Sequence, residues 1–362
     1  MSGPFVLAAG GTGGHLFPAQ ALASELIKRG SRVVVMTDGR GHNYSSAFPG
    51  AEIATVPAAT FAGCSAFGRL VAFGVIATGV VAALAKLKSL RPRAVVGFGG
   101  YPSFPVMIAA WIAHTPTLLH EQNAIPGRVN RLLAPRVTKI AASLPFARFA
   151  PKNPERIVFT GNPVRPEAAA LNTAVYVPPG ADGPIRLLVF GGSQGARSLS
   201  ELVPAAIGAL PERLRSRLKI TQQCRAPDVD MVEKAYRASG IEAEVGKFFT
   251  DLPRRMADAH LVIARSGAST LSELTVIGRP ALLVPYPHAM DDHQSANAAV
   301  LEKAGAAWVV MERDLDAPKL ASLIERILSE PDALRARAQA ARSLGRVDAA
   351  QRLADLAEQL AP

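Results

Sequence analysis

The chain has 362 residues and a formal net charge of +11, a length that corresponds to roughly two domains. Hydrophobic residues make up 49% and charged residues 19%, which excludes a disordered chain and allows a sizeable core. The 14 Phe, 5 Tyr and 2 Trp are too few for rows of side chains that stack on nucleic-acid bases. Cys64 and Cys224 lie far apart and outside any CxxC motif, so we expect a reducing cytosol and neither a disulfide framework nor structural zinc.

The start of the chain and its most apolar segment bear on membrane insertion. Residues 1–5 contain no basic residue, so no signal peptide is expected. Residues 70–85 form the longest apolar stretch. As a helix it would extend about 24 Å, less than the ~30 Å hydrocarbon core of a bilayer, so we expect no spanning helix. It is predicted either as a buried crossover helix or as a helix on an anionic membrane surface, because Arg69, Lys86, Lys88, Arg91 and Arg93 flank it.

In the first half of the chain, short β-branched segments alternate with helical ones, which is typical of βαβ units and parallel sheets. A helix is predicted over residues 16–29, where apolar residues recur with helical spacing and Gly30 provides the stop. The strands predicted in this half are residues 5–9, 32–36, 94–98, 117–121 and 139–143.

The second half repeats the pattern after a proline-rich segment, residues 163–184, that lacks a clear period. Its tail from residue 317 is predicted as helical with a break near Gly345. The sequence therefore predicts two doubly wound α/β domains, whose ligand-binding crevices can face one shared cleft. The strands predicted in this half are residues 187–190, 219–224, 260–264, 281–285 and 308–311.

Two glycine-rich segments follow predicted strands and precede predicted helices, at residues 10–14 (GGTGG) and 191–195 (GGSQG). Backbone N–H groups there, together with the helix dipole, can receive a diphosphate. The alternatives are a tight turn without a ligand and, for Ser193, a helix N-cap. Leu16 stands where a dinucleotide-binding GxGxxG motif requires glycine, and the sequence has no Walker A motif. We favour phosphate contact.

Polar segments follow three further predicted strands. Residues 265–273 (RSGASTLSE) place hydroxyl groups at a helix start, which suits a phosphate, and Glu273 suits a ribose diol; helix capping is the alternative. Residues 97–103 (GFGGYPS) and 120–123 (HEQN) also lie at strand ends. Four consecutive polar groups at residues 120–123 are hard to explain by packing, so they favour a functional site.

Asp291, Asp292 and His293 have the residue types of a metal site. However, side chains of adjacent residues diverge. The DxD motif at residues 314–316 ends in Asp316, which precedes Ala-Pro and is predicted as a helix N-cap. We therefore predict no metal site.

Taken together, these segments resemble the MurG family, the N-acetylglucosaminyltransferases of bacterial peptidoglycan synthesis. The similarity runs from residue 5 to about residue 310, with the motifs in the order of the family. The motifs are GGTGGH (10–15), GFGGYPS (97–103), HEQN (120–123), GNPVR (161–165), GGSQGA (191–196), RSGASTLSE (265–273) and DDHQSANA (291–298).

The resemblance implies an α/β protein with the GT-B fold, in which two Rossmann-like domains face each other across a cleft. We expect an acceptor- and membrane-binding domain at residues 1–162, a linker at 163–184, a UDP-GlcNAc-binding domain at 185–344 and a C-terminal helix at 345–362 that packs back on the first domain. The implied enzyme inverts the anomeric carbon and uses neither a cofactor nor an active-site metal. It moves GlcNAc from UDP-GlcNAc to the C4 hydroxyl of MurNAc in lipid I (undecaprenyl-pyrophosphoryl-MurNAc-pentapeptide), which gives lipid II.

The resemblance also assigns roles to individual residues. In the first domain, Thr12, Gly13 and Gly14 would face the acceptor diphosphate, and Asn123 a GlcNAc hydroxyl group. Gln294 would bind GlcNAc as well. Arg165 and the backbone near Phe249 would bind the uridine side of the donor. Ser193 and residues 268–270 would contact the diphosphate of the donor, and Glu273 would bind its ribose. The full set of these remaining donor contacts is Ser193, Ala268, Ser269, Thr270, Leu271, Ser272 and Glu273.

Deprotonation of the attacking hydroxyl needs a base whose pKa is near neutrality, so His15 is the first candidate. Glu121 is the second candidate, or a partner that orients the base. The departing diphosphate would be stabilised by N–H groups, helix N-termini and Arg165 or Arg265. Two positions depart from the family: His293 replaces a glutamine present in some relatives, and Phe249 replaces an aliphatic residue, which a backbone contact tolerates.

The family implies a peripheral protein on the cytoplasmic face of the inner membrane, because its acceptor lipid lies in the bilayer. We expect residues 64–91 to contact the anionic membrane surface, and cell-wall or division proteins as further partners. Nucleic acid is not expected. The alternatives are another GT-B enzyme, such as a nucleotide-sugar epimerase or a glycolipid synthase, and a non-enzymatic basic protein that binds membrane or nucleic acid, which only the charge supports.

Overall fold

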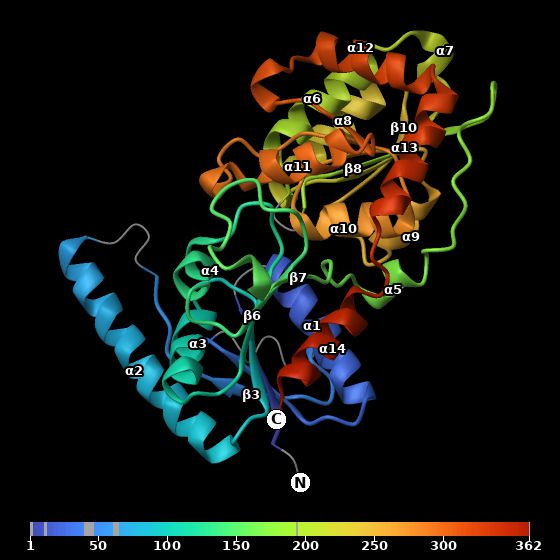
Figure 1. Cartoon of the computed structure of the whole chain (residues 1–362). Helices are drawn as coiled ribbons and strands as arrows, with labels where there is room; N and C mark the ends of the chain where they lie inside the picture. The colour runs from blue at the N-terminus through green and yellow to red at the C-terminus, as the bar shows by residue number, and fades with distance from the viewer. Residues whose placement is uncertain (1–2, 11–12, 40–46, 61–64, 193–194, 362) are drawn as a thin grey trace. The chain divides into compact units, whose positions relative to one another are not determined.

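The computed structural model describes residues 3–10, 13–39, 47–60, 65–192 and 195–361. It consists of two compact units. Unit 1 contains residues 1–165 together with 348–362, and unit 2 contains residues 166–347. Figure 1 follows the chain by colour, and the last helix is grouped with the N-terminal segment.

Among the described residues, unit 1 contains a seven-stranded sheet in the order β3-β2-β1-β4-β5-β6-β7, and every pairing is parallel. The central strands are buried along their whole length, as expected where helices cover both faces of a parallel sheet. The strands are β1 (Phe5–Ala8), β2 (Val33–Thr37), β3 (Glu52–Thr55), β4 (Ala94–Gly97), β5 (Thr117–Glu121), β6 (Lys139–Ala142) and β7 (Ile157–Phe159).

The helices of unit 1 are α1 (Gly13–Lys28), α2 (Ala66–Leu90), α3 (Ser103–Ile112), α4 (Arg128–Leu133) and α14 (Ala349–Leu360), with a short 3-10 helix η2 (Pro154–Arg156). Successive strand residues point to opposite faces of the sheet, and each face has its own core. Phe5 and Leu7 pack with Leu22 of α1 and Leu353 of α14. Val6 packs on the other face, in the core that α2 and α3 complete.

Helix α2 is longer than predicted. The apolar stretch indicated 16 residues, but α2 has 25 and is capped by Ser65, whose hydroxyl accepts a hydrogen bond from the N–H of Gly68. Residues 67–90 are long and apolar enough to cross a membrane by length and composition alone. The length of 16 residues on which the argument against a spanning helix was based is therefore too short, and the absence of a spanning helix stays a prediction.

One face of α2 packs on α3. Gly79 lies at the contact, because a Cβ atom there would be 2.0 Å from the carbonyl oxygen of Pro57 and 3.2 Å from Cβ of Pro105. Pro57 comes just after β3, so the first half of α2, residues 67–78, extends past the carboxyl edge of the sheet, as Figure 1 shows.

In unit 2 the described residues form a six-stranded sheet in the order β10-β9-β8-β11-β12-β13, again with parallel pairing. Strands β8 and β11 at its centre are apolar and almost fully buried. The strands are β8 (Ile185–Phe190), β9 (Leu218–Gln223), β10 (Glu242–Gly246), β11 (Leu261–Ala264), β12 (Ala281–Leu283) and β13 (Ala307–Val309).

The helices of unit 2 are α5 (Pro166–Ala169), α6 (Arg197–Gly208), α7 (Glu212–Arg215), α8 (Val229–Ala238), α9 (Leu252–Asp258), α10 (Ala268–Ile277), α11 (His293–Lys303), α12 (Ala317–Leu328) and α13 (Pro331–Leu344), with 3-10 helices η3 (Ala226–Asp228), η4 (Met290–Asp292) and η5 (Glu312–Asp314). Leu187 of β8 packs with Val203, Val232 and Ile324 from α6, α8 and α12 on one face of the sheet. Figure 1 shows α9 and α10 on the other face. Asp316 caps α12 as predicted, and its carboxylate accepts from the N–H of Lys319 at 2.8 Å.

The segment predicted as a linker is held on unit 2 by two arginines. Arg279 is 2% exposed, and its guanidinium donates to the carbonyl oxygens of Ala174 and Ala257. Arg342 donates to the carbonyl oxygens of Asn172 and, at 2.6 Å, Ala174. Residues 172–174 are therefore anchored through main-chain acceptors to α13 and to the segment between α10 and β12.

The chain passes back to unit 1 after α13, so the predicted helix break near Gly345 is confirmed. The last helix, α14, packs on α1. Arg29 at the end of α1 donates to Asp355 at 2.6 Å and to Glu358 at 2.7 Å.

Candidate active site

The polar segment HEQN lies where β5 ends, and Glu121 is the last residue of that strand. Both carboxylate oxygens are hydrogen-bonded. Oε1 accepts from the main-chain N–H of Asn123 at 2.9 Å and from its side-chain amide at 3.3 Å. Oε2 accepts from the N–H of Gly127 at 3.0 Å and from Nδ2 of Asn130 at 2.7 Å. Glu121 thereby fixes the turn that carries Asn123 and leads into α4.

Burial raises the pKa of Glu121 above its usual range, although the N–H donors from Asn123, Gly127 and Asn130 act in the opposite direction. The four donors occupy the acceptor sites that a general base would use to receive a proton from substrate. This geometry favours an orienting role for Glu121 over a role as base. Asn130 was not among the predicted site residues, since nothing in the sequence pattern pairs it with Glu121.

His120 is fully buried, and its ring contacts Gln122 on its own segment, Gly161 and, at 3.3 Å, the hydroxyl of Ser143. Nδ1 lies 3.1 Å from the side-chain nitrogen of Gln122, which is a donor, so Nδ1 accepts and Nε2 carries the proton. Nε2 then donates to the carbonyl oxygen of Gly161 at 3.3 Å. Burial, together with a smaller effect of the nearby charge of His15, lowers the pKa of His120 to about 4, although the hydrogen bond to Gly161 acts in the opposite direction. His120 is therefore neutral at physiological pH.

His15 is the third residue of α1, close to the turn that follows β4. A Cβ atom built on Gly100 would lie 3.6 Å from Cε1 of His15, and Gly100 has a positive φ of 72°. The positive φ of this turn favours glycine, and 3.6 Å is an ordinary van der Waals distance, so the turn lies directly against the imidazole. Gly13 and Gly14 form the start of α1, which carries no acidic residue in its first turn and so suits an anion. Thr12 lies outside the described residues.

Asp38 and Tyr101 form a partly buried contact near this edge that was not predicted from the sequence. The hydroxyl of Tyr101 donates to Oδ2 of Asp38 at 2.9 Å. Asp38 follows β2, and Tyr101 belongs to the GFGGYPS segment after β4. The position of Asp38 after a buried strand was a signal that could have identified it.

In unit 2, the loop after β8 depends on glycine. Gly195 has a φ of 68°, and a Cβ atom there would lie 2.6 Å from the Arg225 side chain. Gly192 has a φ of 82°. Ser193, the predicted phosphate contact, lies outside the described residues.

The RSGASTLSE segment supplies the N-terminus of α10. Gly267 is the N-cap and provides no capping side chain, so the first-turn N–H groups at residues 268–270 have no acceptor from the cap residue. The hydroxyl oxygen of Ser269 is buried and has no hydrogen-bond partner among the described residues. Both features suit a bound phosphate group.

The other predicted donor residues of α10 differ in orientation. Glu273 and Thr270 are buried side chains one turn apart, 5% and 9% exposed. Leu271 belongs to the core, so a ligand can reach only its backbone. The hydroxyl of Ser272 donates to the carbonyl oxygen of Ala268 at 2.8 Å within the helix.

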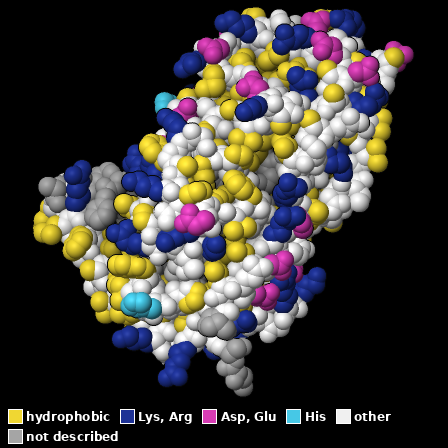
Figure 2. Space-filling view, in the orientation of Figure 1, with side chains coloured by type: hydrophobic (Ala, Val, Ile, Leu, Met, Phe, Trp, Pro, Cys, Tyr) yellow, Lys and Arg dark blue, Asp and Glu magenta, His cyan; other side chains and the backbone are white. Residues whose placement is uncertain are grey.

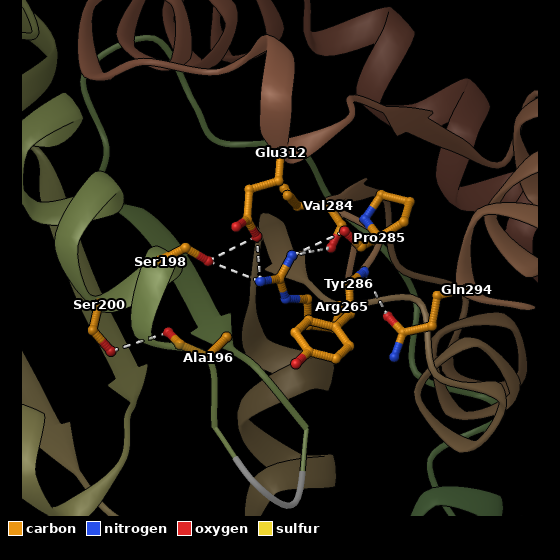
Figure 3. A network of polar contacts seen from close by, with 9 residues as sticks. All are labelled: Ala196, Ser198, Ser200, Arg265, Val284, Pro285, Tyr286, Gln294 and Glu312. Atoms are coloured by element: carbon orange, nitrogen blue, oxygen red, sulfur yellow. Dashed lines mark hydrogen bonds and ion pairs between the residues drawn. The ribbon is translucent and has the colours of Figure 1, made fainter. Parts of the chain in front are cut away.

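Gln294 lies near Tyr286, and Figure 3 shows the contact. Its Oε1 accepts from the N–H of Tyr286 at 3.0 Å, so the side chain presents its amide NH₂ group as a donor. Its main-chain oxygen accepts from the hydroxyl of Ser266 at 2.8 Å. Nδ1 of His293 lies 2.9 Å from the carbonyl oxygen of Met290, so this ring bonds within its own turn.

The two residues predicted on the uridine side stand in different units. The guanidinium of Arg165 lies over the ring of Phe17 at 5.4 Å in unit 1. Phe249 in unit 2 is 8% exposed, and the guanidinium of Arg255 lies over its ring at 4.2 Å. Burial of this ring leaves the backbone as the surface that Phe249 can offer to a ligand.

Among the described residues, no three His, Cys, Asp or Glu side chains form a group that could hold a metal ion. Asp291 and Asp292 both have positive φ angles, 54° and 58°. The carboxylate of Asp292 accepts from the hydroxyl of Ser295 at 2.6 Å. The absence of a metal from the reaction stays a prediction.

Comparison with known proteins identifies the family to which this chain belongs. Residues 5–142 match the glycosyltransferase family 28 N-terminal domain, and residues 186–360 match its C-terminal domain. A UDP-N-acetylglucosamine–N-acetylmuramyl-(pentapeptide) pyrophosphoryl-undecaprenol N-acetylglucosamine transferase from Brucella canis is 50% identical, over 99% of this chain and 94% of the relative. The transferase of the same name from Paramagnetospirillum magneticum is 49% identical, over 98% and 96%.

Solved structures agree with this similarity. The crystal structure of MurG from Acinetobacter baumannii has a TM-score of 0.81 at 29% identity and covers 99% of both chains. The UDP-GlcNAc 2-epimerase from Neisseria meningitidis has a TM-score of 0.68 at 11% identity, over 99% of this chain and 100% of the other. The second likeness shows the fold alone, a GT-B arrangement of α/β units. On the family match and on the identity over nearly its whole length, the chain belongs to the MurG family of glycosyltransferase family 28.

Proposed function

We propose that this protein transfers GlcNAc from UDP-GlcNAc to the C4 hydroxyl of MurNAc in lipid I and so forms lipid II. The observation that carries the proposal is the 49–50% identity to transferases named for this reaction, over 98–99% of the chain. Membership in the family makes the enzyme a UDP-GlcNAc-dependent N-acetylglucosaminyltransferase of peptidoglycan synthesis.

Unit 2 is the proposed donor site. The start of α10 would receive the diphosphate through its first-turn N–H groups and the hydroxyl of Ser269, with Glu273 bound to the ribose. The amide NH₂ of Gln294 would donate to a sugar oxygen, because its carbonyl oxygen is already engaged by Tyr286. Helix N-termini stabilise the negative charge that grows on departing UDP.

Unit 1 is the proposed acceptor site, with His15 as the base. The C4 oxygen of MurNAc attacks C1 of GlcNAc while the bond from C1 to the phosphate oxygen breaks on the opposite face, which inverts the anomeric carbon. The C4 hydroxyl proton passes to His15, and UDP leaves with the bonding electron pair. The start of α1 at Gly13 and Gly14 would face the acceptor diphosphate.

The charge distribution supports a membrane-docking face on unit 1. Residues 53–154 contain eleven Lys or Arg residues and a single acidic residue, the buried Glu121, so this segment carries nearly all of the net charge of +11. An anionic lipid surface attracts such a segment. The proposed location is the cytoplasmic face of the inner membrane, where lipid I is available.

Exposed apolar side chains of α2 supply the contact with the bilayer interior. Phe67, Leu70, Val71 and Val81 share one face of the helix and are 75%, 67%, 50% and 68% exposed. Figure 2 shows hydrophobic and basic side chains intermixed around α2. Soluble proteins rarely expose such a stripe unless it binds a partner or a membrane.

The reaction is tested by incubating the purified protein with UDP-GlcNAc and lipid I. We expect lipid II and UDP in equal amounts, with a β-linked GlcNAc derived from the α-linked donor. An epimerase would instead release UDP and free sugar without any lipid acceptor. Formation of UDP that is independent of lipid I would overturn the proposal.

A further inference from the structure

Arg265 connects four neighbouring strands of the second sheet at their carboxyl edge (Figure 3). It directly follows β11, and its Nη1 donates to the carbonyl oxygens of Val284 and Pro285, each at 3.0 Å, after β12. Its Nη2 donates to the hydroxyl of Ser198 at 2.8 Å, beyond β8, and forms an ion pair with Glu312, beyond β13. One guanidinium therefore contacts the segments that follow β8, β12 and β13.

The charge of Arg265 is balanced within the chain. Its side chain is 6% exposed and that of Glu312 is 25% exposed. Ser198 joins the pair, because its hydroxyl also donates to Oε2 of Glu312 at 2.8 Å. Four of the five N–H donors of Arg265 are used in this way, and the fifth, on Nε, is buried without an acceptor among the described residues. The guanidinium is directed at protein acceptors on both of its terminal nitrogens.

The contacts of Arg265 lead directly to the proposed donor residues. The next residue, Ser266, bonds to Gln294 through its hydroxyl and to Asn297 through its carbonyl oxygen, at 2.8 and 3.2 Å. Tyr286, which follows Pro285, holds the side-chain oxygen of Gln294. Ser198 lies in the first turn of α6, just after the glycine loop at residues 191–195.

We propose that Arg265 and Glu312 form a positioning pair for the sugar nucleotide, and that Arg265 does not bind the diphosphate itself. The pair fixes the start of α6, the start of α10 and Gln294 at the spacing that the donor requires. A site held in this way binds its ligand without first having to order these loops. The inference rests on the proposed donor site in unit 2.

The test compares Arg265→Lys, Glu312→Gln and the double variant in steady-state transfer, with donor and acceptor varied separately. Each single change is expected to raise the KM for UDP-GlcNAc about tenfold and to leave the KM for lipid I unchanged, since small displacements of a binding group have effects of at least this size. The double variant should lose little more than the worse single variant, because both changes remove the same pair.

A direct contact with diphosphate predicts a different result. Glu312→Gln would then keep the donor KM within about twofold, while Arg265→Lys alone would lower kcat by about 100-fold. Additive losses in the double variant would also overturn the proposal. Glu325→Gln is the matched control, because it breaks an exposed ion pair with Arg213 elsewhere in unit 2.

Ser198→Ala keeps both charges of the pair, so it tests the proposal even if the variants that lose a buried charge do not fold. It removes the hydroxyl link to α6 and leaves the ion pair in place. We expect a several-fold higher donor KM with an unchanged melting temperature, and an unchanged KM overturns the proposal.

Glu273→Ala tests the donor site separately. Normal binding of UDP by Glu273→Ala would overturn that site and this inference with it. Weak binding by Glu273→Ala, together with normal donor KM values in the pair variants, would overturn the inference alone.

Discussion

The side-chain amide of Asn130 donates a 2.7 Å hydrogen bond to the carboxylate of Glu121, and this bond ties the end of β5 to α4. Loss of either partner should therefore disturb the same turn. We expect Glu121→Gln and Asn130→Ala each to lower kcat by about 10- to 100-fold, because a small displacement of a positioned group is enough for such a loss. Steady-state transfer rates measured from pH 5 to 9 provide the test.

If Glu121 only positions the turn, both variants keep the shape of the wild-type pH profile. A general base would behave differently, since Glu121→Gln would remove the acidic limb of the profile. Asn130→Ala would then leave the rate close to that of the wild type. That combination would show that Glu121 takes the proton.

His15 is the residue expected to accept the proton. General-base catalysis contributes about 10²- to 10⁴-fold, so His15→Gln should lower kcat by that range while the affinity for UDP, measured by calorimetry, stays unchanged. Glutamine retains a hydrogen-bonding group at nearly the same place and cannot act as a base near neutral pH. A loss of less than about tenfold would remove His15 from the mechanism.

The central strands of both sheets and the edge strand β13 could be predicted from the sequence, and the edge strands β3, β7 and β10 could not. Buried parallel strands such as Val33–Thr37 are continuous apolar segments, which the pattern identifies. The edge strands Glu52–Thr55 and Glu242–Gly246 are partly exposed and contain glutamates, so they are not continuous apolar segments. The strand Ile157–Phe159 has only three residues and lies at the other edge of the first sheet.

The position of the candidate site could be predicted for a similar reason. The residues that follow parallel strands lie at one edge of the sheet. The glycine loops and HEQN could therefore be placed there from their positions after predicted strands. The partners of those residues depend on tertiary contacts. Nothing in the sequence pairs Glu121 with Asn130, Tyr101 with Asp38, or Arg265 with Glu312.

Two glycines of α2 should respond in opposite directions to alanine. Gly74 is exposed, and a Cβ atom added there would meet no described residue within 4 Å, so Gly74→Ala should stabilise the protein by about 0.5–1 kcal/mol through helix propensity. At Gly79 the Cβ would meet the carbonyl oxygen of Pro57 at 2.0 Å. Gly79→Ala should cost about 1–3 kcal/mol. Urea unfolding of both variants checks the signs, and a stabilised Gly79→Ala would contradict the packing of α2 described above.

The membrane proposal needs changes on the outward face of α2. Phe67, Leu70, Val71 and Val81 are suitable for replacement by serine because they are at least half exposed, whereas Ile76 is 9% exposed and part of the buried face. The fourfold serine variant should lose flotation with vesicles that contain anionic lipid, and its melting temperature should change little. The matched control carries serine at two exposed valines of unit 2.

The control positions are Val175 and Val177, which are 81% and 67% exposed. This control should float as the wild type does. Equal flotation of the fourfold variant and the wild type would remove α2 from the docking face, and charge reversal at Lys86 and Lys88 would then show whether the basic residues alone carry the binding.

His120 should make unit 1 less stable in mild acid. Its pKa is lowered to about 4 in the folded protein and returns to about 6.5 on unfolding, so the unfolded chain binds more protons between these values. Stability is therefore fully present above pH 6.5 and falls as the pH drops toward 4. Between pH 7 and pH 5 the contribution amounts to roughly 2 kcal/mol.

His120→Gln isolates this effect, because glutamine keeps a hydrogen-bond donor for Gly161 and does not titrate. Urea unfolding at pH 7 and pH 5 should show a smaller loss of stability for the variant than for the wild type. His260 in unit 2 also has a pKa lowered by burial to about 4, so part of the acid sensitivity remains in the variant. If wild type and variant lose the same free energy over this range, His120 is protonated without cost, and the hydrogen bond assigned from Gln122 to its Nδ1 is wrong.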